Sequence, residues 1–430
     1  MNEKKYKFID LFAGCGGLED GFLQSGKYES IAAVDWLQPQ INTLRKRLET
    51  KWNINDASER VMCFDIRREQ ELFCGWDDDS VLPQYEILPD GKKSRFKTGP
   101  YGKGKGLDYL VNQVGGIDII IGGPPCQAYS IAGRVKDGNG MKNDYRNYLF
   151  EHYLSVVNRY KPKVFIFENV PGMLSATPDG MPITELIRKG FDDIGYEIVD
   201  DLRNYAMINA SDYGVPQHRK RIIILGIRKD ITKEPQTILQ DFYTTVLPHY
   251  KVEHKRTVEE AIGDLPAAYP IIDAQLPGKR ITFTKPECNT TWHVSRRHSL
   301  RDIEIFRMLA EDIEIGLNEY TNTKALSDLY EERVGAKSQI HRYHVLRKDQ
   351  PSTTIISHLD RDGNRFIHYD PKQSRSITPR EAARIQSFDD DFDFLGNQTD
   401  TFIMIGNAVP PVLAKCIALA LADVLEKLER

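Results

Sequence analysis

The segment Gly122–Ser130, with the sequence GGPPCQAYS, comes directly after a largely apolar run at Ile117–Ile121 that predicts a buried strand. Proline has no N–H group to donate to a neighbouring strand in the middle of a sheet, so the strand must end at Pro124. We therefore expect Cys126 in a stiff turn at the carboxyl end of a strand, the edge of an open α/β sheet where ligands bind. A thiol held there is placed as a nucleophile, although most free cysteines are simply small buried hydrophobic side chains.

A second ligand-binding feature lies at the start of the chain. The run Phe8–Phe12 predicts a strand, the small residues of Ala13–Gly17 predict a turn, and Leu18–Ser25 has helical spacing. Glycines let a backbone approach a ligand closely, and the start of a helix offers free N–H groups. The dinucleotide fingerprint G-x-G-x-x-G would need a glycine where Glu19 stands, so the turn does not match that motif.

Three successive predicted strands carry or end in an aspartate: Asp10, Asp35 and Asp65. An acid after the second strand of a doubly wound sheet commonly accepts hydrogen bonds from ribose hydroxyls. An acid after the third strand could accept one from an adenine amino group. Aspartate is also common at strand ends and helix caps for purely local reasons. Three aspartates in register nevertheless favour a cofactor that contains a nucleoside.

Two further charged features fall on predicted strand ends. Glu168 ends the buried run Val164–Phe167 and so shares a sheet edge with Cys126, where apolar walls could raise its pKa and let it act as an acid. Its alternative role is a structural cap. Arg219 and Arg221 are two residues apart, so their side chains point to the same face if the strand already begins at Arg219. Two guanidinium groups on one face could hold a carbonyl or a phosphate. The alternative is that both lie at a solvated strand end.

The chain divides into a βα region, a more polar region and a return segment. Strands and helices alternate through residues 1–228, which predicts an α/β domain with a mostly parallel sheet and helices on both faces. Residues 229–373 lose that rhythm and contain the basic clusters Arg296–His298 and His341–His344, which could meet a phosphate backbone or be solvated surface. Residues 374–430 hold a capped helix and an apolar helix that should pack back on the first domain.

Composition limits the class of protein. The 430 residues have 40% hydrophobic content, 28% charged content and a formal net charge of −4, which argues mildly against a uniformly basic nucleic-acid binder but not against local basic surfaces. The chain shows neither a signal-peptide layout nor a run long enough to span a bilayer, so we predict a cytoplasmic protein without membrane contact. The cysteine and histidine spacings predict neither a disulfide framework nor a metal site.

Taken together, these segments make the chain resemble the DNA cytosine-5 methyltransferases, in the layout of the bacterial restriction-modification enzymes. The matching blocks occur in that family's order: FIDLFAGCGG, DW, DI, GGPPCQAYS, FENV, QHRKRI, TPREAARIQSF and GNAVPP. The resemblance implies a Rossmann-like fold that uses S-adenosylmethionine (SAM), with residues 229–373 as a smaller target-recognition domain. It also implies duplex DNA as substrate, S-adenosylhomocysteine as product, no metal, a monomer, and a cognate restriction endonuclease for the same site.

The resemblance further implies a role for each matching residue. Cys126 would attack carbon 6 of a cytosine flipped out of the duplex, and Glu168 would hold ring nitrogen 3 and the amino group. Arg221 would contact oxygen 2, and Arg219 would be a second active-site arginine. Carbon 5 would then accept the methyl group. SAM contacts are implied for Phe12, Ala13, Gly14, Cys15, Gly16, Gly17, Asp35, Trp36, Asp65, Ile66, Pro125, Leu149, Asn407, Ala408 and Val409.

Two parts of the chain and three rival functions stay open. The Glu69–Gly116 excursion is unassigned, and Ile131–Asn147 could be a lid or an ordinary solvated loop. The second domain matches the family only at Lys348–Ile355, so no recognition sequence follows. A transfer-RNA methyltransferase of the same family is the nearest rival, although the long polar domain favours duplex DNA. A nicotinamide or flavin oxidoreductase and a non-catalytic DNA-binding protein are less consistent with Cys126 and Glu168 on one edge.

Overall fold

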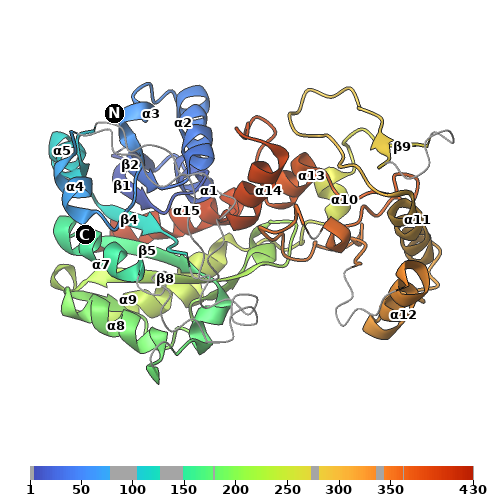
Figure 1. Cartoon of the computed structure of the whole chain (residues 1–430). Helices are drawn as coiled ribbons and strands as arrows, with labels where there is room; N and C mark the ends of the chain where they lie inside the picture. Colours follow the sequence, from blue (N-terminus) through green and yellow to red (C-terminus); the bar gives the residue numbers. More distant parts are fainter. Residues whose placement is uncertain are drawn as a thin grey trace. The chain divides into compact units, whose positions relative to one another are not determined.

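The computed structural model of the chain describes residues 4–77, 104–125, 149–177, 180–272, 280–335, 343–361 and 363–429 (Figure 1). Three features singled out in the sequence lie outside these residues: Cys126, the Ile131–Asn147 loop and the middle of the Glu69–Gly116 excursion. The described chain provides the sheet, the turn after its first strand, and most of the polar region.

The chain forms two compact units. The first contains Met1–Tyr213, Lys220–Glu253 and Ala408–Arg430, and the second contains Gly214–Arg219 and His254–Asn407. These bounds differ from the predicted domain limits, because residues 229–253 belong to the first unit and residues 374–407 to the second. The division of labour between a catalytic and a recognition domain remains a prediction.

The first unit is built on an eight-stranded sheet with the order β3-β2-β1-β4-β5-β8-β6, in which β7 also pairs with β8. The strands β1 to β5 are parallel neighbours, whereas β8 runs antiparallel to β5, β6 and β7 (Figure 1). The mainly parallel α/β fold predicted from the sequence is therefore confirmed. The strand bounds are β1 Tyr6–Leu11, β2 Tyr28–Asp35, β3 Val61–Cys63, β4 Ile119–Gly122, β5 Val164–Asn169, β6 Tyr196–Ile198, β7 Met207–Asn209 and β8 Lys220–Arg228.

The central strands are apolar without alternation because helices or neighbouring elements cover them. All of β4 is buried, and so are five of the six residues of β5, as expected for strands inside a parallel sheet. Tyr153 on α7 places its hydroxyl 3.1 Å from Ile120 O and 3.0 Å from Ile166 O, so this helix packs directly on β4 and β5. The run of isoleucines that predicts a buried strand is thus explained by burial on both faces.

The helices of the first unit follow the strands in chain order. Their bounds are α1 Gly17–Gln24, α2 Gln38–Trp52, α3 Ala57–Arg60, α4 Glu69–Cys74, α5 Leu107–Gln113, α7 Leu149–Tyr160, α8 Ile183–Asp193, α9 Pro235–Asp241 and α15 Pro411–Leu428. Short 3₁₀ or π turns lie at Pro171–Ser175, Ala210–Tyr213, Lys229–Ile231, Phe242–Val246 and Leu247–Tyr250.

The C-terminal helix α15 packs against α1, and the contact needs a glycine. A Cβ on Gly21 would lie 2.4 Å from both Ala414 Cβ and Pro411 O. Tyr28 on β2 donates a hydrogen bond to Ala418 O at 2.6 Å, so α15 is tied to the sheet as well. The expectation that no run is long enough to span a bilayer was wrong by length and composition, because among the described residues Gln398–Leu428 passes that test. However, 67% of its most apolar window is buried in the protein, as in the core helix of a soluble protein.

The second unit contains fewer helices and strands than the first among the described residues. Its elements are α10 Val258–Ile262, β9 Pro270–Ile271, β10 Thr282–Phe283, α11 Leu300–Glu314, α12 Thr323–Val334, a 3₁₀ turn at Gly363–Arg365, α13 Pro379–Ile385 and α14 Gln398–Asn407. The helix predicted after Thr378 is α13, with the full capping box between Thr378 and Glu381. Apolar residues of α11 and α12 form a core cluster with Tyr343, Val345 and Ile367.

We expect Gly21→Ala to destabilise the first unit. Overpacking against the backbone of α15 costs about 1–3 kcal/mol, which equals or exceeds the roughly 1 kcal/mol that alanine gains over glycine inside a helix. The matched control is Gly190→Ala in α8, because its Cβ would meet only the flexible end of Leu154, at 2.5 Å. Thermal and denaturant unfolding of both variants tests this, and an equal loss of stability in the two would contradict it.

Candidate active site

The turn after β1 is held in a conformation that favours glycine. Gly14 has φ 58° and Gly16 has φ 89°, and a Cβ on Gly16 would lie 2.4 Å from Leu44 Cδ1. Phe12, the first residue past β1, also has a positive φ, 59°. The turn leads straight into α1, which begins at Gly17, so free N–H groups of a helix start face the same edge of the sheet.

Asp35, at the end of β2, fixes this turn. Its carboxylate accepts hydrogen bonds from Gly14 N at 3.0 Å and from Leu37 N at 2.9 Å. Burial raises the pKa of Asp35 to about 6, although the N–H groups of Leu37, Gly14 and Trp36 oppose that shift. The residue predicted to bind a ribose thus also organises the backbone beside it, and it has capacity to accept further hydrogen bonds.

Two buried carboxyl groups lie beneath the turn. Asp10 on β1 is 1% exposed, and neither of its carboxyl oxygens has a hydrogen-bond partner among the described residues. Burial, Glu19 and Asp35 together raise the pKa of Asp10 well above its usual value. Burial also raises the pKa of Glu19 to about 7, even though Ser30 donates to it at 2.5 Å. A buried carboxyl group without a hydrogen-bond partner among the described residues is a polar group that a ligand over the turn could satisfy.

The predicted adenine-edge residues lie on the next strand. Asp35 pairs in register with Cys63 of β3, and Phe64 N donates to Asp35 O at 2.8 Å, so the ends of β2 and β3 are adjacent. The carboxylate of Asp65 forms an ion pair with Arg67 at 2.5 Å, which leaves it less free as an acceptor than the sequence suggested. Ile66 is buried and Trp36 is half-buried.

A carboxyl group and an arginine meet on the other side of β4. Arg221 Nε lies 2.9 Å from Glu168 Oε1, and their side chains are only 12% and 13% exposed. Strands β5 and β8 position the pair, because Glu168 stands opposite Ile223 in their antiparallel register. Burial lowers the pKa of Arg221, with the Glu168 carboxylate opposing that shift. The pair is therefore a fixed, largely desolvated donor and acceptor set.

The segment that leads to Cys126 lies against this pair. A Cβ on Gly123 would lie 2.6 Å from Glu168 Oε2, so a larger residue there would displace the Glu168 carboxylate from its position beside Arg221. Asn169 Nδ2 donates to Pro124 O at 3.3 Å, while Val170 N donates to Asn169 Oδ1 at 2.8 Å. Sequence reasoning did not single out Asn169, although its place directly after Glu168 was the available signal. It anchors the Pro-Pro segment to the end of β5.

Arg219 and Arg221 have different surroundings. The strand begins at Lys220, so Arg219 lies before it, in the second unit. Arg219 is 1% exposed and donates to Ile355 O at 2.8 Å and to Gly406 O at 3.0 Å. Gln217, another residue that sequence reasoning did not single out, is also fully buried and accepts from Ile355 N at 3.0 Å. In this structure both side chains hold the backbone of the second unit.

The remaining predicted cofactor residues are distributed as follows. Ala13 and Cys15 are buried in the turn, and burial raises the pKa of the Cys15 thiol, so that this cysteine is an inert packing residue. Leu149 is the first residue of α7 and is buried. Asn407 ends α14 in the second unit, while Ala408 and Val409 open the last segment of the first. Among the described residues, no three His, Cys, Asp or Glu side chains are grouped as a metal site would require.

Comparison with known proteins gives the same assignment as the sequence motifs. The sequence profile of the family described as C-5 cytosine-specific DNA methylase matches residues 6–75 and 95–423. The type II methyltransferase M.Bpa9945I of Bacillus paralicheniformis is 35% identical over 462 residues, which cover 97% of this chain and 98% of that protein. The type II methyltransferase M.XorII of Xanthomonas oryzae is 31% identical over 433 residues, which cover 97% and 85% of the two chains.

A solved structure shares the fold. A prophage-encoded E. coli protein, assigned as a DNA modification methyltransferase, superposes with a TM-score of 0.59 at 22% identity, covering 98% of this chain and 100% of that one. The family match spans nearly the whole chain and includes the Pro-Pro-Cys and Glu-Asn-Val blocks on which the resemblance rested. The chain therefore belongs to the C-5 cytosine-specific DNA methylase family and is a DNA cytosine-5 methyltransferase.

Proposed function

We propose that the enzyme transfers the methyl group of SAM to carbon 5 of one cytosine in a short, specific sequence of duplex DNA. The observation that carries this proposal is the Arg221–Glu168 pair, which lies against Gly123 on the segment that leads to Cys126. Carbon 5 of cytosine is a poor nucleophile, and covalent addition at carbon 6 divides one difficult step into easier ones. That route needs a thiolate, a carboxyl group and a fixed cation, and these residues supply one of each.

Each residue then has a defined task. The Cys126 thiolate forms a bond to carbon 6, and the electron pair of the 5,6 double bond moves toward carbon 5. Glu168 binds ring nitrogen 3 and the amino group and offsets the charge that develops on the ring, while Arg221 holds oxygen 2. After carbon 5 has gained the methyl group, it loses its proton, the carbon–sulfur bond breaks, and the double bond reforms.

The target base must leave the duplex for this chemistry. A stacked cytosine exposes neither face of its ring to a thiol, so the enzyme must flip it out, at a cost of a few kcal/mol. Arg221 and Glu168 are held by strands of the central sheet, which makes them a rigid receiver for the flipped base.

The turn after β1 is the proposed SAM site. When bound, SAM supplies an electrophilic methyl group. The Gly14–Gly17 backbone would approach the cofactor closely, and Asp35 would accept hydrogen bonds from the ribose hydroxyls. Trp36, Asp65 and Ile66 would face the adenine. The buried Asp10, which has no partner among the described residues, supports a polar ligand at this edge.

The biological setting follows from the relatives. Those reported above are type II methyltransferases. We infer that this enzyme likewise protects DNA from a cognate restriction endonuclease that recognises the same site, and that it works as a monomer in the cytoplasm. Resistance of DNA from expressing cells to such an endonuclease, lost when Cys126 is replaced, tests this setting.

The first experiment uses purified protein, SAM labelled in the methyl group, a mixed-sequence DNA duplex and a structured RNA. Products are mapped at base resolution. We expect label on carbon 5 of cytosine at one short duplex motif. Label on RNA alone would move the assignment to the transfer-RNA branch of the family, and label on adenine or on cytosine nitrogen would overturn the proposed chemistry.

Replacing Cys126 by serine should abolish methyl transfer. A hydroxyl is far less ionised than a thiol at neutral pH, so the bond to carbon 6 does not form. SAM binding, measured by calorimetry, should stay close to that of the wild type because the thiol meets only the base. Turnover by Cys126→Ser at a rate near that of the wild type would exclude this residue as the nucleophile.

Replacing Glu168 by glutamine should slow the chemical step by about 10²-fold or more, the usual scale for lost acid–base assistance. The change also leaves the buried Arg221 without its carboxylate. Single-turnover methylation with saturating SAM and DNA measures the rate.

The matched control for Glu168→Gln is Arg228→Gln at the far end of β8, which breaks an exposed pair with Asp230 and should leave the rate unchanged. A Glu168→Gln variant that alters only the Michaelis constant for DNA would contradict the assigned role.

SAM affinity should fall as the pH drops through about 6, the pKa of Asp35. Protonation removes an acceptor, so binding is favoured by the ionised form and should be up to about tenfold weaker at pH 5 than at pH 7. Asp35→Asn should bind SAM more weakly and with no such dependence. Glu19→Gln is the control for the neighbouring carboxyl group, whose pKa is about 7, and should keep the profile. A flat profile in the wild type would remove Asp35 from the ribose site.

A further inference from the structure

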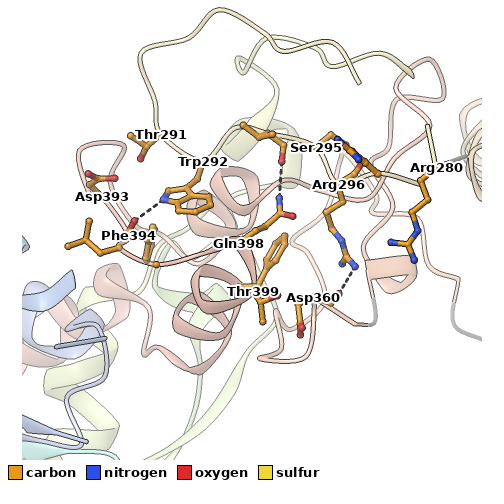
Figure 2. Close-up of a pocket in the computed structure, with 15 residues that line it drawn as sticks. Arg280, Thr291, Trp292, Ser295, Arg296, Asp360, Asp393, Phe394, Gln398 and Thr399 are labelled. Carbon is orange, nitrogen blue, oxygen red and sulfur yellow. Dashed lines mark hydrogen bonds between the residues drawn. The ribbon is translucent and has the colours of Figure 1, made fainter. Parts of the chain in front are cut away.

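The second unit contains a cavity that the proposed chemistry does not use. Its volume is about 930 Å³, within the size range of small-ligand sites. The lining comes from Arg280, from six residues between Thr291 and Arg297, from Asp360, and from seven residues of the loop and helix between Asp393 and Phe402. Figure 2 shows one side formed by Arg280, Arg296 and Asp360, the other by Thr291, Trp292, Asp393 and Phe394, and Gln398 and Thr399 between them.

One arginine of the cavity is locked in place by neutral groups. Arg296 donates to Leu359 O at 2.8 Å and to Asp360 O, and its guanidinium lies 6.0 Å from the centre of the Phe402 ring. Burial lowers the pKa of Arg296, with the Asp360 carboxylate opposing and the Arg280 charge reinforcing that shift. The side chain is thus a fixed cation in the wall, close to a second cation.

The other two arginines are exposed and available. Arg280 and Arg297 both line the cavity, and within the described part of the chain neither has a carboxylate at ion-pair distance. The acids of the lining act on other groups, because Asp360 interacts with Arg296 and Asp393 with the buried Arg380. Burial lowers the pKa of nearby His298 to about 3, and Arg296, Arg375 and Arg280 reinforce that effect. On this side of the cavity Asp360 offsets the charge of Arg296, whereas Arg280 and Arg297 have no carboxylate partner among the described residues and can attract an anion.

The opposite side is a rigid aromatic wall. Trp292 donates from its ring to Phe394 O at 2.8 Å, and its backbone has a positive φ of 68°. Arg380 supports that backbone: its N donates to Trp292 O at 3.1 Å, and its guanidinium donates to Thr291 O and Phe392 O, each at 2.9 Å. A strained residue held by this many bonds indicates a preformed site. Aromatic faces beside cations are the surfaces that nucleotides contact.

The start of α14 completes the lining. Gln398 Nε2 donates to Val294 O at 3.2 Å, and the Asn397 side chain caps the helix by accepting from Asp400 N at 3.0 Å. The Asp400 carboxylate in the first turn accepts in return from Asn397 N at 3.1 Å, so this helix start is already capped by an acid and the arginines supply the positive charge of the cavity.

We propose that this cavity binds a phosphate-bearing nucleotide unit, with Arg280 and Arg297 as its phosphate contacts. That this nucleotide belongs to a DNA strand rests on the proposed function. A DNA phosphate held in the second unit of the protein would fix the position of the duplex during methylation of the flipped base. A free nucleotide offers the same chemistry, so the experiment must separate the two sources.

The test measures affinity for a duplex by fluorescence anisotropy between 50 and 200 mM salt, for the full-length chain and its Arg280→Gln and Arg297→Gln variants. Each lost phosphate contact lowers the slope of log affinity against log salt by about 0.9, so the loss of affinity across this range becomes roughly threefold smaller. Arg307→Gln on α11 is the control, because it removes the same charge from an exposed i,i+4 pair with Glu311 in the same unit. Thermal unfolding verifies that the exposed substitutions leave the fold intact.

A reduced slope in both cavity variants, with an unchanged slope in the control, supports the DNA contact. A full slope in both cavity variants overturns it. Parallel titrations with deoxycytidine monophosphate identify the other source: saturable binding that Arg280→Gln abolishes, together with an unchanged DNA slope, would assign the cavity to a free nucleotide. Methylation is mapped in the same samples so that the two proposals can be separated. If the wild type methylates cytosine but the cavity variants keep the full salt slope, only the proposed phosphate contact is excluded and the proposed function stands.

Discussion

The close approach of β1, β4 and β5 at their carboxyl ends is the constraint on which the first unit depends. A Cβ on Gly122 would lie 2.3 Å from Leu11 O, and one on Gly123 would lie 2.6 Å from the Glu168 carboxylate. Two successive glycines therefore let the chain pass between the turn of the first strand and the acid of the fifth. Because the strands are parallel, the proposed cofactor turn and the proposed base-binding pair share one edge of the sheet.

That edge carries more buried carboxyl groups than a purely structural site would retain. Asp10, Glu19 and Asp35 are desolvated together, and each has a raised pKa. Burying carboxyl groups costs free energy unless hydrogen bonds compensate, and Asp10 has none among the described residues. Such local cost is characteristic of sites that bind a ligand, where the ligand provides the missing partners.

Buried arginines hold the loops of the second unit in place, whereas a β-sheet organises the first unit. Arg219, Arg375 and Arg380 are fully buried and donate to backbone carbonyls or, in the case of Arg375, to both oxygens of Glu381 at 2.7 Å. Burial would raise the pKa of Glu381, but Arg375 holds it at about 2. Removing one partner of such a pair leaves a buried charge uncompensated, so these side chains enforce a single loop geometry in a region with little regular structure. The cavity beside Trp292 is rigid because these buried arginines hold the loops that line it.

The amino-acid pattern alone predicts the alternation of strands and helices, the capped helix after Thr378, the mainly parallel sheet and the family. These features depend on local patterns: apolar runs that must be buried, prolines that end strands, and a capping box within four residues. Which side chains contact one another becomes known only from the folded chain. It separates Arg219 from Arg221 by assigning them to different units, gives Asp65 an ion-pair partner, and reveals Asn169 as the anchor of the Pro-Pro segment. It also gathers Arg280, Arg296 and Asp393 around one cavity, since contacts between residues far apart in the chain depend on packing that no local pattern specifies.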